Sequence, residues 1–365
     1  MNVKEHVPVI VIGGGPAGIA AALTLNARNI PCLVVDAKTG RYHHYGECLP
    51  PNALPLFKQL GLQQLLDNEE HTYYLGNQSV WGNNKVAEKL FLFQKHNQGV
   101  LLNRPLFEEQ LRDLLLKSKS RLLTGYAFHN VVSQGEKLNV TLKSKTETLP
   151  ISCNFIIDAT GRKASVCRKL GRQKEQLDQL AALHFQVTLN TTIPKFVYTE
   201  SIENGWFYAA PLSKRKLSVM LFTDMDLLPE KDKQQAFICD AVKGSTLIKQ
   251  LFSKPLTSDK ISKLKTHAAN STRMQKPYGE NWIAIGDAAY SFDPISSYGI
   301  TSALAAGYYG AHALADTLAQ KPDALQTYQY IMENAFVHYH IKLHEHYNAE
   351  QRWPDSLFWQ RRHQE

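Results

Sequence analysis

The sequence has no long apolar run, no paired-cysteine motif and no internal repeat. None of its apolar stretches approaches the roughly 20 residues that cross a bilayer, so we expect no membrane span and no membrane partner. Only eight, mostly polar residues precede the first apolar stretch, which predicts a cytoplasmic protein without a signal peptide. The five cysteines are odd in number and lack C-x-x-C spacing, so we expect reduced thiols and no zinc site.

A metal site and a nucleic-acid interface are also not expected. The histidines near the C-terminus (His338, His340, His344 and His346) do not lie on one helical face, so we predict no metal. The net charge of +8, from 41 basic and 33 acidic residues, is spread along the chain, and no nucleic-acid-binding module is visible. A basic surface instead suits an anionic cofactor and an acidic protein partner.

The chain is organised around a glycine-rich turn near its N-terminus. Residues 9–12 (Val-Ile-Val-Ile) predict a buried parallel strand, and Gly13, Gly15 and Gly18 follow as G-x-G-x-x-G at the start of a helix. A second apolar strand then brings Asp36 to the position where a ribose hydroxyl needs an acceptor. This order predicts a dinucleotide site, because the helix N-terminus offers free N–H groups to phosphate. The residues expected to hold the dinucleotide here are Gly13, Gly15, Pro16, Ala17, Gly18, Asp36, Ala37 and Arg41.

Later stretches are predicted to reach the same site. Arg104 lies just before a helix, where its guanidinium is placed to bind a pyrophosphate. One buried strand runs into the turn Asp-Ala-Thr-Gly at 158–161, and another runs into Gly-Asp at 286–287. The segment 293–300 then opens a helix of small residues, which allows a cofactor ring to approach the backbone. The residues expected at the cofactor in these stretches are Arg104, Asp158, Gly161, Gly286, Asp287, Pro294, Gly299 and Ile300.

The middle of the chain has a different pattern. Between 181 and 228 longer strands rich in aromatic residues are typical of an antiparallel sheet, inserted into the nucleotide-binding domain. The residues after 325 are helical. We therefore predict an α/β fold in three parts. These are a discontinuous nucleotide-binding domain (1–70, 95–175 and 275–325), an antiparallel-sheet substrate domain (71–94 and 176–274) and a C-terminal helical segment (326–365).

The three glycine turns, in this order and spacing, resemble those of the FAD-dependent hydroxylase and halogenase superfamily. The resemblance implies a Rossmann-like FAD-binding domain of the glutathione-reductase type, which holds FAD in extended form. It places Asp36 at the adenosine ribose, and Arg104 and Asp287 at the pyrophosphate and ribityl chain. It places the backbone from Pro294 to Ile300 beside the isoalloxazine ring. No second G-x-G-x-x-G follows, so no separate NAD(P) domain is expected.

A longer series of motifs narrows the resemblance to the LodB/GoxB-like flavoproteins. These proteins mature amine or amino-acid oxidases by installing a tryptophylquinone cofactor from a peptidyl tryptophan. The likeness covers nearly the whole chain, and the tail and the Trp-Phe-Tyr strand are its most specific parts. The motifs are Gly46-Glu47 with Pro50-Pro51, Trp81-Gly82, Asn103-Arg104-Pro105, Gly205-Trp206-Phe207-Tyr208, Thr223-Asp224-Met225-Asp226, the segment 293–299 and the tail 350–362.

The resemblance implies an FAD monooxygenase that hydroxylates a tryptophan of a partner oxidase precursor. FAD would be reduced by NAD(P)H or another electron donor, and molecular oxygen would be the co-substrate. Indole is electron-rich, so we expect no catalytic dyad; the protein has to orient the indole and exclude water. Glu47 is the candidate for orienting the indole N–H or moving a proton. The expected catalytic residues are Glu47, Pro294 and Ser296, and the expected substrate-side residues are Trp81, Trp206 and Tyr208.

Two alternative functions remain open. In the flavin-dependent halogenases, a lysine beyond the Gly-Glu loop carries the hypohalous species to the substrate. The comparable region here, 71–75, has tyrosines and no lysine, while Lys58 and Lys85 lie outside it. The other alternative is a flavoprotein that acts as a chaperone for its partner without oxygenase activity.

Overall fold

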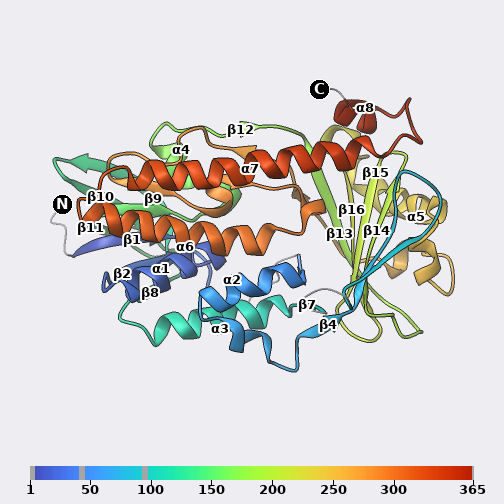
Figure 1. The fold of residues 1–365 in the computed structure, drawn as a ribbon, viewed down its shortest axis with the longest axis horizontal. Helices are drawn as coiled ribbons and strands as arrows, with labels where there is room; N and C mark the ends of the chain where they lie inside the picture. Colours follow the sequence, from blue (N-terminus) through green and yellow to red (C-terminus); the bar gives the residue numbers. More distant parts are fainter. Residues whose placement is uncertain (1–4, 41–45, 93–97, 364–365) are drawn as a thin grey trace.

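The computed structural model describes residues 5–40, 46–92 and 98–363. Two large sheets lie at opposite ends of an elongated molecule (Figure 1). Helix α6 (Gly299–Leu318) covers the first sheet, and the longer helix α7 (Ala324–Asn348) runs from the first sheet towards the second. This architecture confirms the predicted α/β fold with a helical C-terminus.

The first sheet is parallel at its centre. Its strand order is β8-β2-β1-β11-β10-β9, and β19 also pairs with β11. Val9, Ile10 and Val11 of β1 are fully buried, as expected where both faces of a parallel strand are covered. Ile12 lies between Val35 and Asp158, so the carboxyl ends of three strands meet at the edge where such sheets bind ligands. The strands are β1 (His6–Ile12), β2 (Cys32–Asp36), β8 (Arg121–Thr124), β9 (Ala127–Gln134), β10 (Lys137–Lys143), β11 (Thr148–Asp158) and β19 (Trp282–Ala284).

Small residues allow α1 (Pro16–Ala27) to pack closely against α6. A Cβ added to Gly307 of α6 would lie 2.3 Å from the carbonyl oxygen of Ala17, so no larger residue fits at this crossing. The contact holds the N-termini of both helices at the carboxyl edge of the sheet. The other helices are α2 (Leu54–Gln59), α3 (Arg104–Leu116), α4 (Ser165–Lys169), α5 (Gln234–Gly244) and α8 (Leu357–His363).

The second sheet has the order β17-β13-β16-β15-β14-β5-β6. It is antiparallel as predicted, except that β5 and β14 are parallel, because β5 enters from the small sheet β3-β7-β4 and not through a hairpin. The strands of this sheet are β5 (Gly76–Val80), β6 (Ala87–Leu90), β13 (Leu180–Thr188), β14 (Phe196–Ile202), β15 (Gly205–Pro211), β16 (Lys216–Asp224) and β17 (Ser262–Ala268). The short strands elsewhere are β3 (Cys48–Leu49), β4 (Thr72–Tyr74), β7 (Gly99–Leu101), β12 (Glu175–Gln176), β18 (Thr272–Arg273) and β20 (Tyr290–Ser291).

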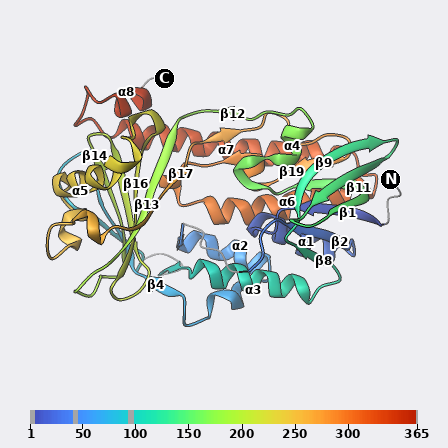
Figure 2. The same cartoon turned by 180° about the vertical axis from the view of Figure 1, so that it is seen from behind.

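The two faces of the second sheet have different partners. On β13, Leu183 and Phe185 belong to the core beneath α5, which lies on the outer side of the sheet (Figure 2). Ala182 and His184 point to the opposite face, because side chains alternate along a strand. That inner face is turned towards the first sheet (Figure 2). The predicted domain boundaries stay a prediction.

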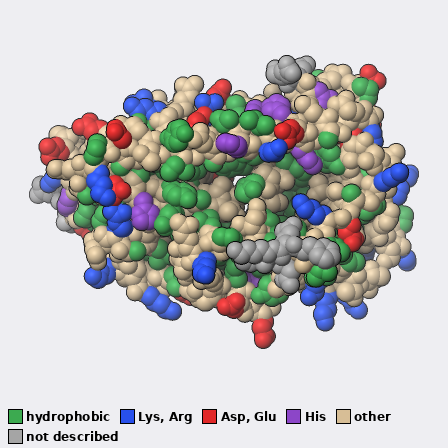
Figure 3. Space-filling model, in the orientation of Figure 1, with side chains coloured by type: hydrophobic (Ala, Val, Ile, Leu, Met, Phe, Trp, Pro, Cys, Tyr) green, Lys and Arg blue, Asp and Glu red, His purple; other side chains and the backbone are tan. Residues whose placement is uncertain are grey.

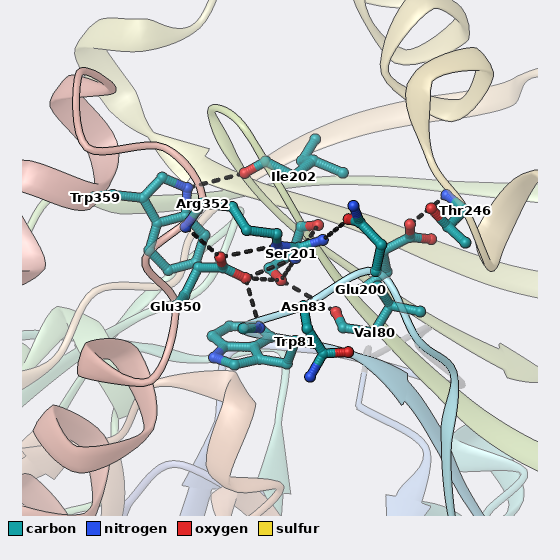
Figure 4. A network of polar contacts seen from close by, with 12 residues as sticks. Val80, Trp81, Asn83, Glu200, Ser201, Ile202, Thr246, Glu350, Arg352 and Trp359 are labelled. Carbon is teal, nitrogen blue, oxygen red and sulfur yellow. Dashed lines mark hydrogen bonds and ion pairs between the residues drawn. The ribbon is translucent and has the colours of Figure 1, made fainter.

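The C-terminal tail is attached to the second sheet by a buried carboxylate (Figure 4). Glu350 is fully buried and accepts hydrogen bonds from the Gly82 N–H (2.8 Å), the Ser201 hydroxyl (2.6 Å) and Arg352 Nη2 (2.6 Å). The indole N–H of Trp359 donates to the Ile202 carbonyl at 2.9 Å. The tail therefore holds together the ends of strands β5 and β14.

Acid should weaken this attachment. Although burial favours the neutral acid, hydrogen bonds from Arg352 and Ser201 lower the pKa of Glu350 from 4.5 to about 2. The stabilisation is thus present above the unfolded pKa and is lost as the pH falls towards about 2. We expect Glu350→Gln to lower the free energy of unfolding by about 3 kcal/mol at neutral pH, because it leaves Arg352 without its buried counter-charge. In this variant, the part of the free energy of unfolding that depends on the ionisation of Glu350 should also be lost.

Chemical denaturation at pH 7 and at pH 3 measures both effects. Asp226→Asn is the matched control, because Asp226 pairs with Arg361 at the surface and such a pair contributes little. Equal unfolding free energies for Glu350→Gln and the parent protein at pH 7 would contradict the assignment.

No helix of the described residues is long and apolar enough to cross a membrane.

Candidate functional site

A cavity of about 760 Å³ lies between the carboxyl edge of the first sheet and the inner face of the second. Figure 3 shows the surface hollowed between these two parts, with hydrophobic side chains around the hollow. Helices α1, α3 and α6 each bring their first residues to the cavity wall, through Ala17, Arg104 and Ile300. Three helix N-termini directed at one space favour an anionic ligand.

The glycine-rich turn leaves the room that a pyrophosphate needs. Gly15 lines the cavity, and a Cβ added there would meet no atom within 4 Å. Gly13 has a φ of +119°, and its added Cβ would lie 2.1 Å from the Ala159 carbonyl oxygen. An added Cβ on Gly18 would lie 1.9 Å from the Gly13 carbonyl oxygen. Gly13 and Gly18 thus serve the turn and its packing, while Gly15 keeps the cavity open.

Asp36 stands at the end of β2 in the cavity wall, where a ribose would lie. Its Oδ1 accepts a hydrogen bond from the Lys38 N–H (3.1 Å), and its Oδ2 pairs with Arg112 Nη2 (3.1 Å). The neighbouring Ala37 also lines the cavity. Arg112 was not predicted from the sequence, although it lies eight residues after Arg104 and therefore on the same face of α3.

Arg104 lines the cavity and is nearly buried. Its guanidinium donates to the Gly46 carbonyl at 2.9 Å and pairs with Glu108 at 2.6 Å. These contacts hold the loop that leads to Glu47. Direct binding of a pyrophosphate by Arg104 stays a prediction. Arg41 lies outside the described residues.

Asp158 and Gly286 lie behind the cavity and not in its wall. Asp158 is fully buried and accepts hydrogen bonds from the Thr160 N–H (3.0 Å) and the Cys167 N–H (2.9 Å), so it shapes the turn. Gly286 has a φ of +56°, and an added Cβ would lie 2.9 Å from the Cβ of Ala17. Neither residue is therefore placed for the direct cofactor contact that was predicted. Each positions the residues that follow it.

The residues that follow these two turns do reach the cavity. Gly161 and Arg162 line it after Asp158, and Asp287 lines it after Gly286. Arg162 Nε lies 3.6 Å from Asp287 Oδ2, and this ion pair joins the two turns. Lys174 Nζ donates to the Asp287 carbonyl at 2.9 Å, and burial lowers the pKa of Lys174 to about 8.

The loop before α6 is fixed by Asp293. Its carboxylate accepts hydrogen bonds from the Ile295 N–H (2.8 Å) and the Tyr347 hydroxyl (2.8 Å), and burial raises the pKa of Asp293 to about 7. Pro294 and Gly299 line the cavity, and their place beside a flavin ring stays a prediction. Ser296 is not in the cavity wall: its hydroxyl donates to the Asp293 carbonyl at 2.7 Å and closes the turn. A catalytic role for Ser296 is therefore not supported.

The second sheet supplies the opposite wall of the cavity. This wall combines small, apolar and aromatic residues with two histidines, from four neighbouring strands and from Ala269, which follows β17. Among the predicted substrate-side residues, only Tyr208 belongs to it. The wall residues are Ala182, His184, Tyr208, Met220, Phe222, His267, Ala268 and Ala269.

A chain of buried polar groups leads from this wall to Glu47. His184 Nε2 lies 3.0 Å from the Ser218 hydroxyl, which donates to Glu47 Oε1 at 3.4 Å. Burial raises the pKa of Glu47, while the charge of Arg104 lowers it. Glu47 is thus separated from the cavity by Ser218 and His184, and the expectation of a site without a dyad did not foresee this chain. The signal was present, since His184 is a polar residue at an inward position of an apolar strand.

Two buried oxygens beside this chain have no hydrogen-bond partner among the described residues. They are Glu47 Oε2 and the Tyr208 hydroxyl. Burial raises the pKa of Tyr208 well above its usual value, so its hydroxyl stays protonated and can donate. Because an unsatisfied buried polar group costs free energy, the hydroxyl of the wall residue Tyr208 indicates a place for a polar ligand group.

The structure places Trp81 and Trp206 away from the cavity. Trp206 is fully buried, stacks on Phe222 with ring centroids 4.0 Å apart, and donates its N–H to the Tyr347 hydroxyl at 3.0 Å. Trp81 donates its indole N–H to the His346 carbonyl at 2.8 Å, next to the buried Glu350 (Figure 4). Both side chains pack the C-terminal helices onto the second sheet, which corrects their predicted place on the substrate side.

No group of histidine, cysteine and carboxylate side chains in the described ranges could hold a metal ion. The open space at Gly15, the acid at the end of β2 and the three helix N-termini fit an extended dinucleotide. The fold and the cavity together define a flavoprotein of the oxidoreductase class. The chain belongs to the family described as the FAD binding domain, which matches residues 6–335.

Individual relatives agree with this class. LodB of Marinomonas mediterranea, named as an FAD-dependent oxidoreductase, is 29% identical over 98% of this chain and 97% of its own length. This match confirms the predicted resemblance to LodB. QhpG, a peptidyl tryptophan dihydroxylase essential for tryptophylquinone cofactor biogenesis, has the same fold, with a TM-score of 0.80 and 23% identity over 98% of this chain and 78% of its own. CmlS, a flavin-dependent halogenase, superimposes with a TM-score of 0.89 and 23% identity over 99% of this chain and 68% of its own.

Proposed function

We propose that this protein is an FAD-dependent monooxygenase that hydroxylates a tryptophan of a partner oxidase precursor during tryptophylquinone biogenesis. NAD(P)H or another donor reduces the flavin, and molecular oxygen is the co-substrate. The similarity to LodB over nearly the whole chain and the fold of QhpG support this substrate. When bound, reduced FAD and oxygen supply an electrophilic oxygen atom.

The composition of the cavity wall carries the proposal. On the side of the second sheet, the described wall residues include histidine, phenol and apolar side chains but no lysine. Lys38 and Lys163 line the cavity at the opposite side, next to the glycine turns. The lysine that the resemblance assigns to halogenases therefore has no counterpart among the cavity-lining residues of the second sheet. Small residues such as Ala182 and Ala269 leave room for a flat indole.

Each polar group of the wall has a task in this reaction. The Tyr208 hydroxyl provides a buried hydrogen-bonding position in the cavity wall that orients the substrate. Oxygen attack on an indole carbon must be followed by loss of the ring proton. His184 lines the cavity and accepts this proton. Ser218 is hydrogen-bonded to both His184 and Glu47, and so connects the imidazolium that forms to the carboxyl group of Glu47. The apolar residues Met220 and Phe222 exclude water from the ring.

Co-expression with candidate oxidase precursors tests the function. Intact-mass analysis of the precursor should show added oxygen on one tryptophan when the flavoprotein is present, and none when it is absent. A stable complex without any mass change would support the chaperone function instead.

An assay with bromide separates the halogenase alternative. The fold of CmlS is the observation that favours it. Reduced flavin, oxygen and bromide should leave free tryptophan and small indoles unmodified, because the described wall offers no lysine amine. A brominated indole would overturn the proposed monooxygenase.

A further inference from the structure

Strand β17 is an edge strand of the second sheet, and it borders the cavity. It pairs with β13 on one side, and no other described strand pairs with its outer edge. His267 and Ala268 of β17 also line the cavity. The same strand is therefore both a wall of the site and an open edge of the sheet.

The register shows which backbone groups face outward. Ala181 pairs with Ala268, and one residue further the Ala269 N–H donates to the Leu180 carbonyl at 2.8 Å. Backbone groups alternate in direction along an antiparallel strand, so the N–H and C=O groups of Ala268 and Thr266 point away from β13. Both residues are exposed. An open edge of this kind is a template for an added strand.

We propose that an acidic, extended segment of the partner precursor docks as an additional strand on the outer edge of β17 and so brings its tryptophan into the cavity. This inference rests on the proposed function, because it names how the polypeptide substrate of that site is held. Main-chain hydrogen bonds would provide affinity without requiring a particular sequence. Alternate side chains of the docked strand would point to the cavity side, beside His267.

The charge of the edge selects its occupant. The sequence of β17, Ser-Lys-Leu-Lys-Thr-His-Ala, has no acidic residue, and Lys265 is exposed on it. Lys260, just before the strand, is also exposed but pairs with Asp259 at 3.8 Å, so Lys265 is the main positive charge of the described residues at this edge. Two copies of β17 side by side would place like charges together, which is unfavourable, whereas a strand with glutamate or aspartate is favoured. A second copy of this chain is therefore not the expected occupant.

Proline substitution at an outward position tests the edge directly. Thr266→Pro removes an N–H that points away from β13, so the pairing within the sheet is retained. The probe is a short synthetic peptide of alternating threonine and glutamate around one tryptophan, and a lysine-for-glutamate peptide is the comparison. Fluorescence anisotropy should show that Thr266→Pro binds the acidic peptide at least about tenfold more weakly than the parent protein does, the loss expected for a main-chain hydrogen bond.

Leu90→Pro is the matched control. Leu90 lies on β6, the opposite edge of the same sheet, and the Phe91 N–H donates to the Leu75 carbonyl, so the Leu90 N–H also points outward. Binding of the acidic peptide should be unchanged in this variant. Flavin absorbance shows whether each variant is folded.

Lys265→Glu tests the same edge without altering the backbone, in case Thr266→Pro does not fold. It should weaken binding of the acidic peptide by about fivefold and strengthen binding of the lysine peptide by a similar factor, as expected for one cross-strand charge pair. Hydrogen exchange of residues 262–268 should slow when the acidic peptide binds to the parent protein.

The two proposals fail in different ways. If the acidic peptide does not bind, binds Thr266→Pro equally well, or binds no better than the lysine peptide, docking on β17 is wrong. Dimerisation of the parent protein through β17 would also overturn it. If the peptide binds at β17 but its tryptophan never gains oxygen, docking stands and the proposed monooxygenase is wrong.

Discussion

Replacing Gly15 by alanine is expected to give a folded protein that no longer holds FAD. Gly15 has a φ of −81°, which alanine adopts without strain, and its added Cβ meets no protein atom within 4 Å. The methyl group would instead occupy the space that the pyrophosphate needs beside the N-terminus of α1. Losing two charge-assisted hydrogen bonds to phosphate should weaken FAD binding by more than about 100-fold.

Flavin absorbance and a titration with FAD measure the loss, and denaturation of the FAD-free proteins measures stability. The FAD-free Gly15→Ala variant should be as stable as the FAD-free parent protein, or more stable by about 0.4–1 kcal/mol, because alanine restricts the unfolded chain. Gly13→Ala is the contrasting variant. Gly13 has a φ of +119°, and the added Cβ would lie 2.1 Å from the Ala159 carbonyl oxygen, so this variant should not fold. Normal FAD binding by Gly15→Ala would mean that the dinucleotide lies elsewhere.

This difference between two glycines of one motif shows where sequence reasoning ends. The spacing of Gly13, Gly15 and Gly18 predicted the strand, the turn and the helix, because few residues tolerate that geometry. The burial of Asp158 behind its turn could not be predicted in this way. A carboxylate that follows a strand has the same sequence context whether it contacts a cofactor or the backbone of its own turn.

The inner wall of the cavity was the least predictable part. Trp206 and Tyr208 are two residues apart on β15 and share a face, yet Tyr208 reaches the cavity and Trp206 is covered by the C-terminal helices. That cover depends on contacts with Tyr347, more than a hundred residues later. The chain from His184 through Ser218 to Glu47 likewise joins two neighbouring strands of the second sheet with the loop before β3, and only the tertiary fold brings these together. The alternation of side chains along β13 indicated that His184 points inward, but no local sequence pattern indicated its partners Ser218 and Glu47.

The largest catalytic effect is expected for His184→Asn. The variant keeps a polar side chain beside Ser218 but has no basic nitrogen to accept the ring proton. Tryptophan hydroxylation in the precursor should therefore slow by about 100- to 10,000-fold, the usual contribution of a general base, while FAD stays bound. Single-turnover reactions followed by intact mass give the rate, and flavin absorbance gives the occupancy.

The dependence on pH separates a proton relay from a purely structural role of Glu47. The relay requires the ionised form of Glu47, and burial raises the pKa of this carboxyl. The rate should therefore rise as the pH passes upward through the raised pKa. Glu47→Gln removes the titrating group, so its slower rate should lose this rise. Ser218→Ala interrupts the contact with Glu47 and should change the pH profile in the same way, although His184 is retained. If Glu47→Gln and Ser218→Ala both keep the pH profile of the parent protein, Glu47 only supports the loop that Arg104 holds, and His184 acts alone.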